Sequence, residues 1–371
     1  MDFGFSPEQE QLRAQVRRFL DAECPIERVR TLMDSSEPHD AMLWGKMAEL
    51  GWLALAVPEE HGGLGLQWED VIVVAEEMGR TLFPAPFLAT AVASRAIDKL
   101  GGGQQKERWL PRVASGELIP ALAVNEPSDL RGPDGITVEA RAEGRGVVLR
   151  GTKTFVSDAQ SAGLLLIAAR EAGGISLFAV AADLPGVGVV PLKLVDPTHR
   201  AGRVTLDDVQ VRAEDRVGAP GKAWGELENV LNAEIVAESA QMVGAADAAI
   251  KLAAEYARVR KQFGYPIGRF QGVKHRLAEL YVGVESARSL TYYASWAVDH
   301  LPAPARYVSM AKAFATDALD QAGEECVQIH GAIGFTWECD AHLYYKRGRY
   351  CRTLLGSAEY HRERVLTSQG L

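Results

Sequence analysis

The chain has 371 residues, of which 47% are hydrophobic and 24% are charged, and its formal net charge is −9. This length predicts two or three packed units in a globular protein. The acidic balance argues against a nucleic-acid surface, and apolar runs such as LLLIAA (164–169) are too short to insert across a membrane. The first residues, MDFGFSPEQEQ, lack a basic and apolar leader, so we expect no signal peptide. The four cysteines show no CxxC spacing, which is typical of reduced thiols and favours a cytoplasmic location.

The hydrophobic period changes twice along the chain. Helical spacing runs through residues 1–118 and begins at Ser6, an N-cap followed by Pro7. Between 119 and 222 apolar and polar residues alternate, which predicts strands. Long helices return over 223–371, with a final helical region from about 340 to 368. The pattern predicts an α+β fold with an N-terminal helical domain, a central sandwich- or barrel-like β domain and a C-terminal bundle of four-helix type.

Several well-known site signatures are missing. No G-x-x-x-x-G-K-[ST] occurs and no G-x-G-x-x-G follows a strand, so neither a P-loop nor a dinucleotide-binding fold is predicted. The HGGLG segment (61–65) is interpreted as a tight turn. The histidines show no HExxH or paired i,i+4 spacing, so we expect no metal site. A G-x-S-x-G nucleophile elbow is also absent.

Three segments have residue combinations that core packing alone does not explain, and they are candidate site segments. AVNEP (123–127) and TFVS (154–157) each lie where a predicted strand ends. In YARVRKQFGYPIGRFQGVKH (256–275), a basic helix terminus meets a turn before a new helix begins. Cations at a helix C-terminus are favoured by the dipole alone. The more specific hypothesis is that Arg260 binds a phosphate and that Gln271 presents an amide nearby.

Taken in order, these segments resemble the acyl-CoA dehydrogenase family. VPEEHGGLGL, AVNEP, TFVS, VRKQFGYPIGRFQ and QIHGAIGF (328–335) follow the family order over almost the entire chain. The resemblance implies the family's fold of helical, β and helical-bundle domains. It also implies FAD as cofactor, an acyl-CoA thioester oxidised to its 2,3-enoyl form, and an electron-transfer flavoprotein as acceptor. A homo-oligomer is implied as well, because part of each cofactor is held by a neighbouring subunit.

The resemblance assigns cofactor contacts residue by residue. Val124 and Asn125 are expected along the flavin edge, Phe155 against the ring system and Ser157 near its N5 atom. Arg260, Phe263 and Gln271 are expected to meet the ADP part of a neighbour's FAD. Plain core packing is the alternative for Phe155 and Phe263. The remaining expected contacts are Gln328, Gly331, Ala332 and Ser357.

The family's reaction needs a carboxylate that removes the proton α to the thioester carbonyl. Most relatives carry it as a Glu directly before Gly-Thr, and here Leu355 precedes Gly356-Ser357. A minority carry the base on the helix before the VRKQFG segment, where the matching position is Glu234. Glu238 lies one turn further on the same face and is the second candidate. The alternative is that both glutamates are solvated helix positions.

Other functions stay open from the sequence. The missing carboxylate and the altered SDLRG loop after Pro127 would also suit a non-catalytic subunit, which completes another chain's FAD site in a heterotetramer. AHLYYKRGRY (341–350) resembles members of mixed assemblies, some of which act on steroid side-chain thioesters. A flavin monooxygenase or nitroalkane oxidase on the same fold is a further alternative.

Overall fold

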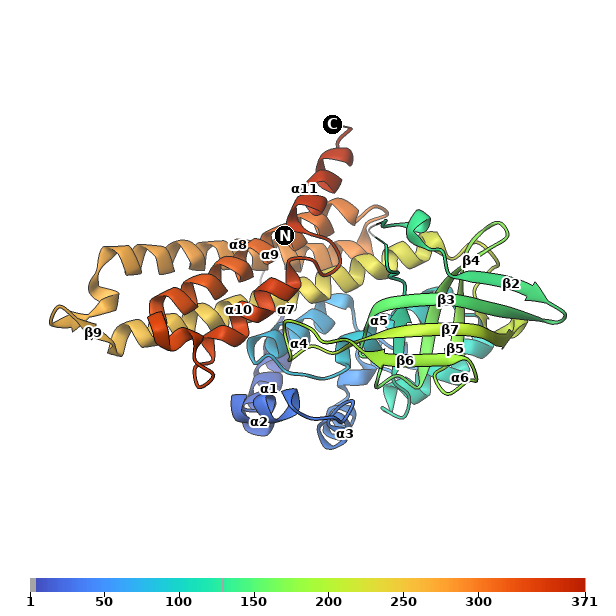
Figure 1. Cartoon of the computed structure of the whole chain (residues 1–371), viewed down its shortest axis with the longest axis horizontal. Helices are drawn as coiled ribbons and strands as arrows, with labels where there is room; N and C mark the ends of the chain where they lie inside the picture. Colours follow the sequence, from blue (N-terminus) through green and yellow to red (C-terminus); the bar gives the residue numbers. More distant parts are fainter. Residues whose placement is uncertain (1–4, 129, 371) are drawn as a thin grey trace. The chain divides into compact units, whose positions relative to one another are not determined.

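The computed structural model describes residues 5–128 and 130–370 and divides into two compact units (Figure 1). The helical unit consists of Met1–Thr31, Trp68–Phe83 and Asn232–Leu371. The sheet unit consists of Leu32–Gln67 and Pro84–Leu231. Segments far apart in sequence therefore share one core in each unit.

The first helix begins where its capping residues predict. The Ser6 hydroxyl accepts a hydrogen bond from the Gln9 amide, and the Gln9 side chain accepts one from the Ser6 amide, so two of the unpaired N–H groups at this terminus are satisfied. The N-terminal helices are α1 (Pro7–Glu23), α2 (Ile26–Met33), α3 (Ala41–Glu49), α4 (Trp68–Arg80), α5 (Phe87–Leu100) and α6 (Gly103–Ala114).

One mixed sheet forms the middle of the sheet unit, with strand order β6-β7-β3-β2-β4-β5-β8, and β1 pairs with β4 off this path. The β1–β4 pairing is parallel, whereas β3 pairs antiparallel with both β2 and β7. The side chains that alternate inward, among them Leu149, Leu165 and Phe178, form the apolar core. The strands are β1 (Pro120–Ala123), β2 (Glu139–Glu143), β3 (Gly146–Ser157), β4 (Leu164–Glu171), β5 (Gly174–Ala181), β6 (Val187–Pro191), β7 (Ala201–Arg212) and β8 (Arg216–Val217).

Long helices make up the C-terminal part, as expected, and a turn divides the final helical region. The chain leaves helical geometry after Cys351 and resumes it at Ala358. The expected single helical region at about 340–368 is therefore two helices joined by a turn. The helices are α7 (Trp224–Val259), α8 (Gln271–His300), α9 (Ala305–His330), α10 (Ala341–Cys351) and α11 (Ala358–Thr367), and the short strands β9 (Lys261–Gln262) and β10 (Tyr265–Pro266) join α7 to α8.

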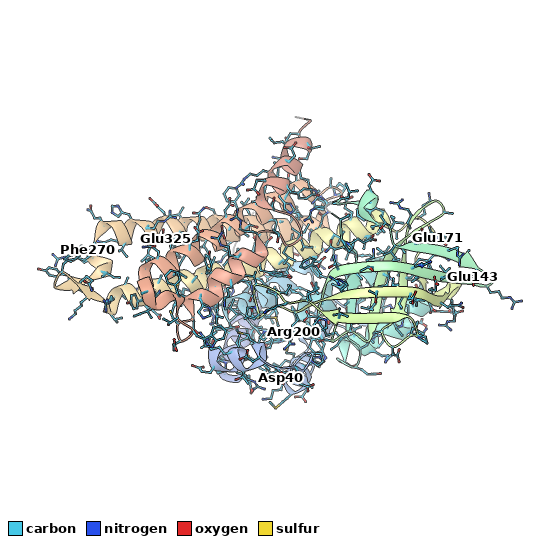
Figure 2. All side chains as sticks on the ribbon, viewed as in Figure 1. Asp40, Glu143, Glu171, Arg200, Phe270 and Glu325 are labelled. Carbon is cyan, nitrogen blue, oxygen red and sulfur yellow. The ribbon has the colours of Figure 1, made fainter. Side chains whose placement is uncertain are left out.

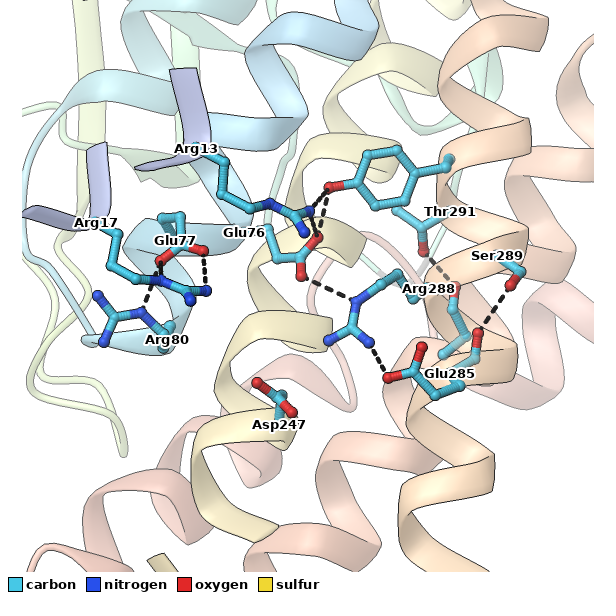
Figure 3. A network of polar contacts seen from close by, with 12 residues as sticks. Arg13, Arg17, Glu76, Glu77, Arg80, Asp247, Glu285, Arg288, Ser289 and Thr291 are labelled. Atoms are coloured by element: carbon cyan, nitrogen blue, oxygen red, sulfur yellow. Dashed lines mark hydrogen bonds and ion pairs between the residues drawn. The ribbon is translucent and has the colours of Figure 1, made fainter. Parts of the chain in front are cut away.

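A buried polar network crosses the helical unit (Figure 3). The Glu76 carboxylate on α4 accepts hydrogen bonds from Arg13 of α1 at 3.2 Å and from two residues of α8, Tyr292 at 2.5 Å and Arg288 at 3.0 Å. Next to it, Glu77 pairs with Arg17 and Arg80. These contacts satisfy charges that would be costly to bury alone.

The expected fold class is confirmed: an N-terminal helical region, a central mixed sheet and a C-terminal helical domain follow one another along the chain. Over the described residues, none of the helices combines the length and the apolar character that a membrane-spanning segment requires.

Candidate active site

The ends of β1 and β3 lie together in the sheet unit. Val124 and Asn125 directly follow β1, and the Thr154 amide of β3 donates a hydrogen bond to the Asn125 carbonyl at 2.9 Å. Phe155 and Ser157 belong to the same end of β3. Four of the predicted flavin contacts are therefore brought to one edge of the sheet.

A β-bulge turns Phe155 out of the sheet. Lys153 pairs with Val204 and Val156 with Gly202, so two residues of β3 face a single residue of β7. Phe155 has a φ of 50°, a left-handed conformation that is rare for a bulky side chain. Its side chain is 49% exposed. The alternative of core packing is wrong for Phe155, because the ring projects from the sheet.

A buried ion pair lies directly behind this edge and was missed from the sequence. The Lys153 ammonium donates to the Glu126 carboxylate at 2.7 Å and to the Val124 carbonyl at 3.0 Å. Burial lowers the pKa of Lys153 to about 8. Burial alone would raise the pKa of Glu126, but bonds from Lys153, Thr137 and Val138 outweigh it and lower this pKa. Strand periodicity could have indicated an inward Lys153, but no sequence signal pairs it with a residue 27 positions away.

The candidate base lies near the beginning of α7. Glu234 is partly exposed, whereas Glu238 one turn later is 6% exposed, so Glu238 is not a solvated helix position. Although the residue as a whole is partly exposed, burial of its carboxyl group, followed by the neighbouring charge of Glu238, raises the pKa of Glu234 to about 8. The indole N–H of Trp68 donates to the carbonyl of Ala233 at 2.9 Å and fixes this turn of the helix. A carboxylate with such a pKa can exchange protons near neutrality.

The turn between α10 and α11 carries Leu355 in a strained backbone. Leu355 has a φ of 55° and Gly356 a φ of 112°. A Cβ on Gly356 would lie 2.9 Å from Nε2 of His361, so the position requires glycine. The Ser357 hydroxyl accepts from the Tyr360 amide at 3.2 Å and caps α11. The conformation of this turn is therefore well defined. The Leu355 side chain, however, has no group that accepts a proton.

A two-residue hairpin ends α7 at the other end of the helical unit (Figure 1). Phe263 and Gly264 have φ values of 52° and 82°, the pair of left-handed residues that a type I′ turn requires. Phe263 is 87% exposed, so core packing is wrong for this residue too. Arg260 and Gln271, which flank the hairpin, are also exposed.

Next to the hairpin lies a pocket of about 330 Å³. It brings together Phe263 and Gln328, two of the predicted contacts, whereas Arg260, Gln271, Gly331 and Ala332 are not part of its wall. An ion pair between Arg276 and Glu325 at 2.9 Å closes one side. Figure 2 shows Phe270 and Glu325 toward this end of the bundle. The other lining residues are Gln262, Ile267, Gly272, Val273 and Ile329.

The two groups of predicted residues in the helical unit lie far apart. Glu234 is near the start of α7 and Arg260 directly follows its end, 26 residues later. At 1.5 Å per residue this separation is about 39 Å. Glu234 and the hairpin therefore cannot contact the same small group.

Comparisons with known proteins identify the family of the chain. Family models match residues 6–117, 121–209 and 223–369, which are described as the N-terminal, middle and C-terminal domains of acyl-CoA dehydrogenase. The chain is 34% identical over 351 residues to acyl-CoA dehydrogenase FadE12 of Mycobacterium tuberculosis, covering 90% of this chain and 89% of the relative. The ChsE4-ChsE5 complex of Mycobacterium tuberculosis contains a chain with a TM-score of 0.92 and 29% identity, covering 100% of this chain and 99% of that one.

A second solved structure, the glutaryl-coenzyme A dehydrogenase glutaryl-CoA complex, also gives a TM-score of 0.92. Its identity is 28%, over 100% of this chain and 96% of that one. Domains, sequence relatives and structural neighbours thus agree over the full length. The chain therefore belongs to the acyl-CoA dehydrogenase family, whose members are FAD-dependent oxidoreductases that act on the CH–CH group of acyl-CoA thioesters.

Proposed function

We propose that Glu234 is the base that removes the α proton of an acyl-CoA thioester, which the protein oxidises to the 2,3-enoyl form. The observation that carries this proposal is a carboxyl group whose pKa is raised to about 8 by burial and by Glu238. Such a pKa is matched to proton abstraction near neutral pH. Leu355 cannot take this role, because a leucine side chain has no basic atom.

FAD supplies the hydride acceptor when it is bound, and the residues at three places suit it. The exposed ring of Phe155 offers an aromatic face, and Ser157 beside it offers a hydroxyl donor. The pocket next to Phe263 has a volume of about 330 Å³ and is lined by the aromatic rings of Phe263 and Phe270. In the described part of the chain no hydrogen bond or ion pair engages the Arg260 guanidinium, which leaves it available to a phosphate.

The separation along α7 supports an oligomer. Because Glu234 and Arg260 are about 39 Å apart, we infer that the hairpin of one chain serves a cofactor whose reactive ring lies at another chain's base. We propose that Arg260, Phe263, Gln271, Gln328, Gly331 and Ala332 hold the ADP part of a neighbour's FAD. We also propose that Ser357 lies on the flavin side of its turn, that an electron-transfer flavoprotein accepts the electrons, and that the protein acts in the cytoplasm.

Anaerobic bleaching of the flavin tests the base directly. The purified, FAD-loaded protein is mixed with short, branched, long and steroid acyl-CoAs, and the best substrate is then given to E234Q, E238Q and E255Q. Glu255 is an exposed glutamate on the same helix and serves as the matched control. We expect E234Q to slow bleaching by about a hundredfold or more while E255Q keeps the parental rate. An unchanged rate in E234Q would refute the base assignment.

A second candidate function is that of a partner subunit which completes the site of another chain. Leu355 favours it, and so does the similarity to a chain of the ChsE4-ChsE5 complex. The chain purified alone distinguishes the two functions. Full FAD occupancy with turnover in the absence of any partner excludes the partner role, whereas activity that appears only on adding a second chain supports it.

A further inference from the structure

The Lys153–Glu126 ion pair joins two strands that the sheet itself does not pair. Among the described residues, β1 pairs with β4, and β3 pairs with β2 and β7. The Lys153 side chain is 0% exposed and that of Glu126 is 3% exposed. From β3 the ammonium reaches the Val124 carbonyl and the Glu126 carboxylate, both just beyond β1. Together with the Thr154–Asn125 bond, it sets where the end of β1 lies relative to the end of β3.

Glu126 is itself fixed from a third direction. Its second oxygen accepts from the Thr137 amide at 2.9 Å and from the Thr137 hydroxyl at 2.5 Å. The oxygen that meets Lys153 also accepts from the Val138 amide at 3.0 Å. The carboxylate therefore has little freedom to follow the ammonium, and Lys153 is held at a defined point.

Stability alone does not explain such a pair. Two buried charges lose much of their attraction to desolvation, and an apolar pair of similar volume is often as stable. What the pair adds is a defined backbone geometry. Phe155, two residues after Lys153, depends on such a geometry. Its left-handed conformation is costly and persists only where the surroundings determine it fully.

We propose that Lys153 is a positioning residue for the flavin: through Glu126 and the Val124 carbonyl it fixes the strand ends that place Asn125, Phe155 and Ser157 against the redox ring. The proposal rests on the function proposed above, in which these residues contact FAD. Lys153 lies behind the strand ends and acts on the ring through the residues it holds.

The main variant removes both charges together. K153M/E126Q leaves no buried charge without its partner, so it is the version expected to fold. E126Q is the second variant: it leaves the Lys153 ammonium without a counter-charge but keeps an oxygen acceptor for it, so the geometry is changed less. The control is E171Q/R216M, which removes another part-buried ion pair of the same unit, at 2.6 Å (Glu171 is labelled in Figure 2). That pair joins β4 to β8, and in the described part of the chain neither residue bonds to Lys153 or Glu126.

Each protein is loaded with FAD, and three quantities are measured: the midpoint potential by reductive titration, the visible flavin spectrum, and the bleaching rate with acyl-CoA. We expect K153M/E126Q to shift the potential and the spectrum and to slow bleaching by about tenfold to a hundredfold. E126Q is expected to shift them the same way by less. The control is expected to lower thermal stability without moving the potential or the spectrum.

The proposal is overturned if K153M/E126Q or E126Q folds, binds FAD and keeps the parental potential and spectrum. It is also overturned if the control shifts them equally, because any lost ion pair would then suffice. Neither the potential nor the spectrum needs a substrate, so a failed base assignment for Glu234 leaves this test intact. A parent protein that binds no FAD would refute the proposed function and this role together.

Discussion

The buried ammonium of Lys312 donates a hydrogen bond to the Gly356 carbonyl at 3.2 Å and another to the Cys351 carbonyl at 3.0 Å, so one side chain of α9 holds both ends of the turn that carries Leu355. The ring of His361 contacts the Leu355 carbonyl at 3.1 Å. This turn therefore keeps its shape without help from the Leu355 side chain.

A carboxylate placed on this turn should recover part of the lost function. We expect E234Q/L355E to bleach at least about tenfold faster than E234Q, because a fixed backbone presents the new group at a defined place. The matched control is E234Q/L355Q, which has the same shape without the charge. Equal rates in these two double variants would show that the turn does not face the substrate's α carbon.

The pH dependence should identify the base. Because the folded pKa of Glu234 is raised to about 8, its carboxylate form grows as pH rises through 8, and the bleaching rate should rise over the same range. E238Q removes a neighbouring negative charge, so the midpoint should move to lower pH. The pKa of Lys153 is also about 8, so a midpoint near pH 8 does not by itself identify Glu234. The change of this midpoint between the parent and E238Q, measured by stopped-flow, identifies the titrating group. An unshifted midpoint in E238Q would contradict the coupling.

Subunit mixing tests whether the base and the hairpin belong to different cofactor sites. E234Q and R260M are each expected to be nearly inactive alone. In randomly mixed dimers, one of the two sites of each mixed pair would be intact, so co-refolded samples should regain about a quarter of parental activity. Self-mixed samples of each variant are the controls. If mixing restores nothing, Arg260 serves the cofactor of its own chain.

The Glu76 network should contribute far more to the free energy of unfolding than an exposed ion pair does. E76A leaves Arg13, Arg288 and Tyr292 facing an empty position, and we expect a loss of about 3–5 kcal/mol in the free energy of unfolding. The comparison is E143A, which breaks an exposed pair with Arg141 and should cost less than about 1 kcal/mol. Chemical denaturation measures both, and similar losses would contradict a structural role for the network.

Two helical glycines should respond oppositely to alanine. A Cβ on Gly244 of α7 would lie 1.9 Å from the Glu76 carbonyl oxygen of α4, so G244A must push these helices apart and should cost about 1–3 kcal/mol. Nothing lies within 4 Å of a Cβ on Gly283 of α8, so G283A should gain up to about 1 kcal/mol from helix propensity. Thermal unfolding compares them, and a neutral G244A would show that the contact can relax.

Local patterns predicted much of the fold. The Ser6 cap and the helical character of the C-terminal part agree with the sequence, because capping and helical periodicity are properties of neighbouring residues. The bounds of the break between Cys351 and Ala358 could not be predicted from local pattern, since LLGS contains no proline and a single glycine is tolerated within a helix. Its backbone is determined by Lys312 and His361, which contact it through the tertiary fold.

The candidate site shows the same contrast between features set by neighbouring residues and features set by tertiary contacts. Strand-end and turn positions such as Asn125 and Phe263 could be identified from motif resemblance and local composition. The bulge at Phe155 could not, because it appears only when β3 is paired with β7. The ion pair behind it depends on a contact between distant strands. The raised pKa of Glu234 likewise depends on the side chains packed around it and on a neighbour one helical turn away.

The left-handed turn at Leu355 also matters for redesign. Lys312 and His361 form hydrogen bonds with its main chain, so the side chain at position 355 contributes little to the conformation of the turn. Because the proposed base, Glu234, lies on α7, the turn does not need to carry a reactive side chain. With Glu234 as the proposed base, we expect libraries that vary Leu354 and Leu355 to change acyl-group preference without removing the proton-accepting group.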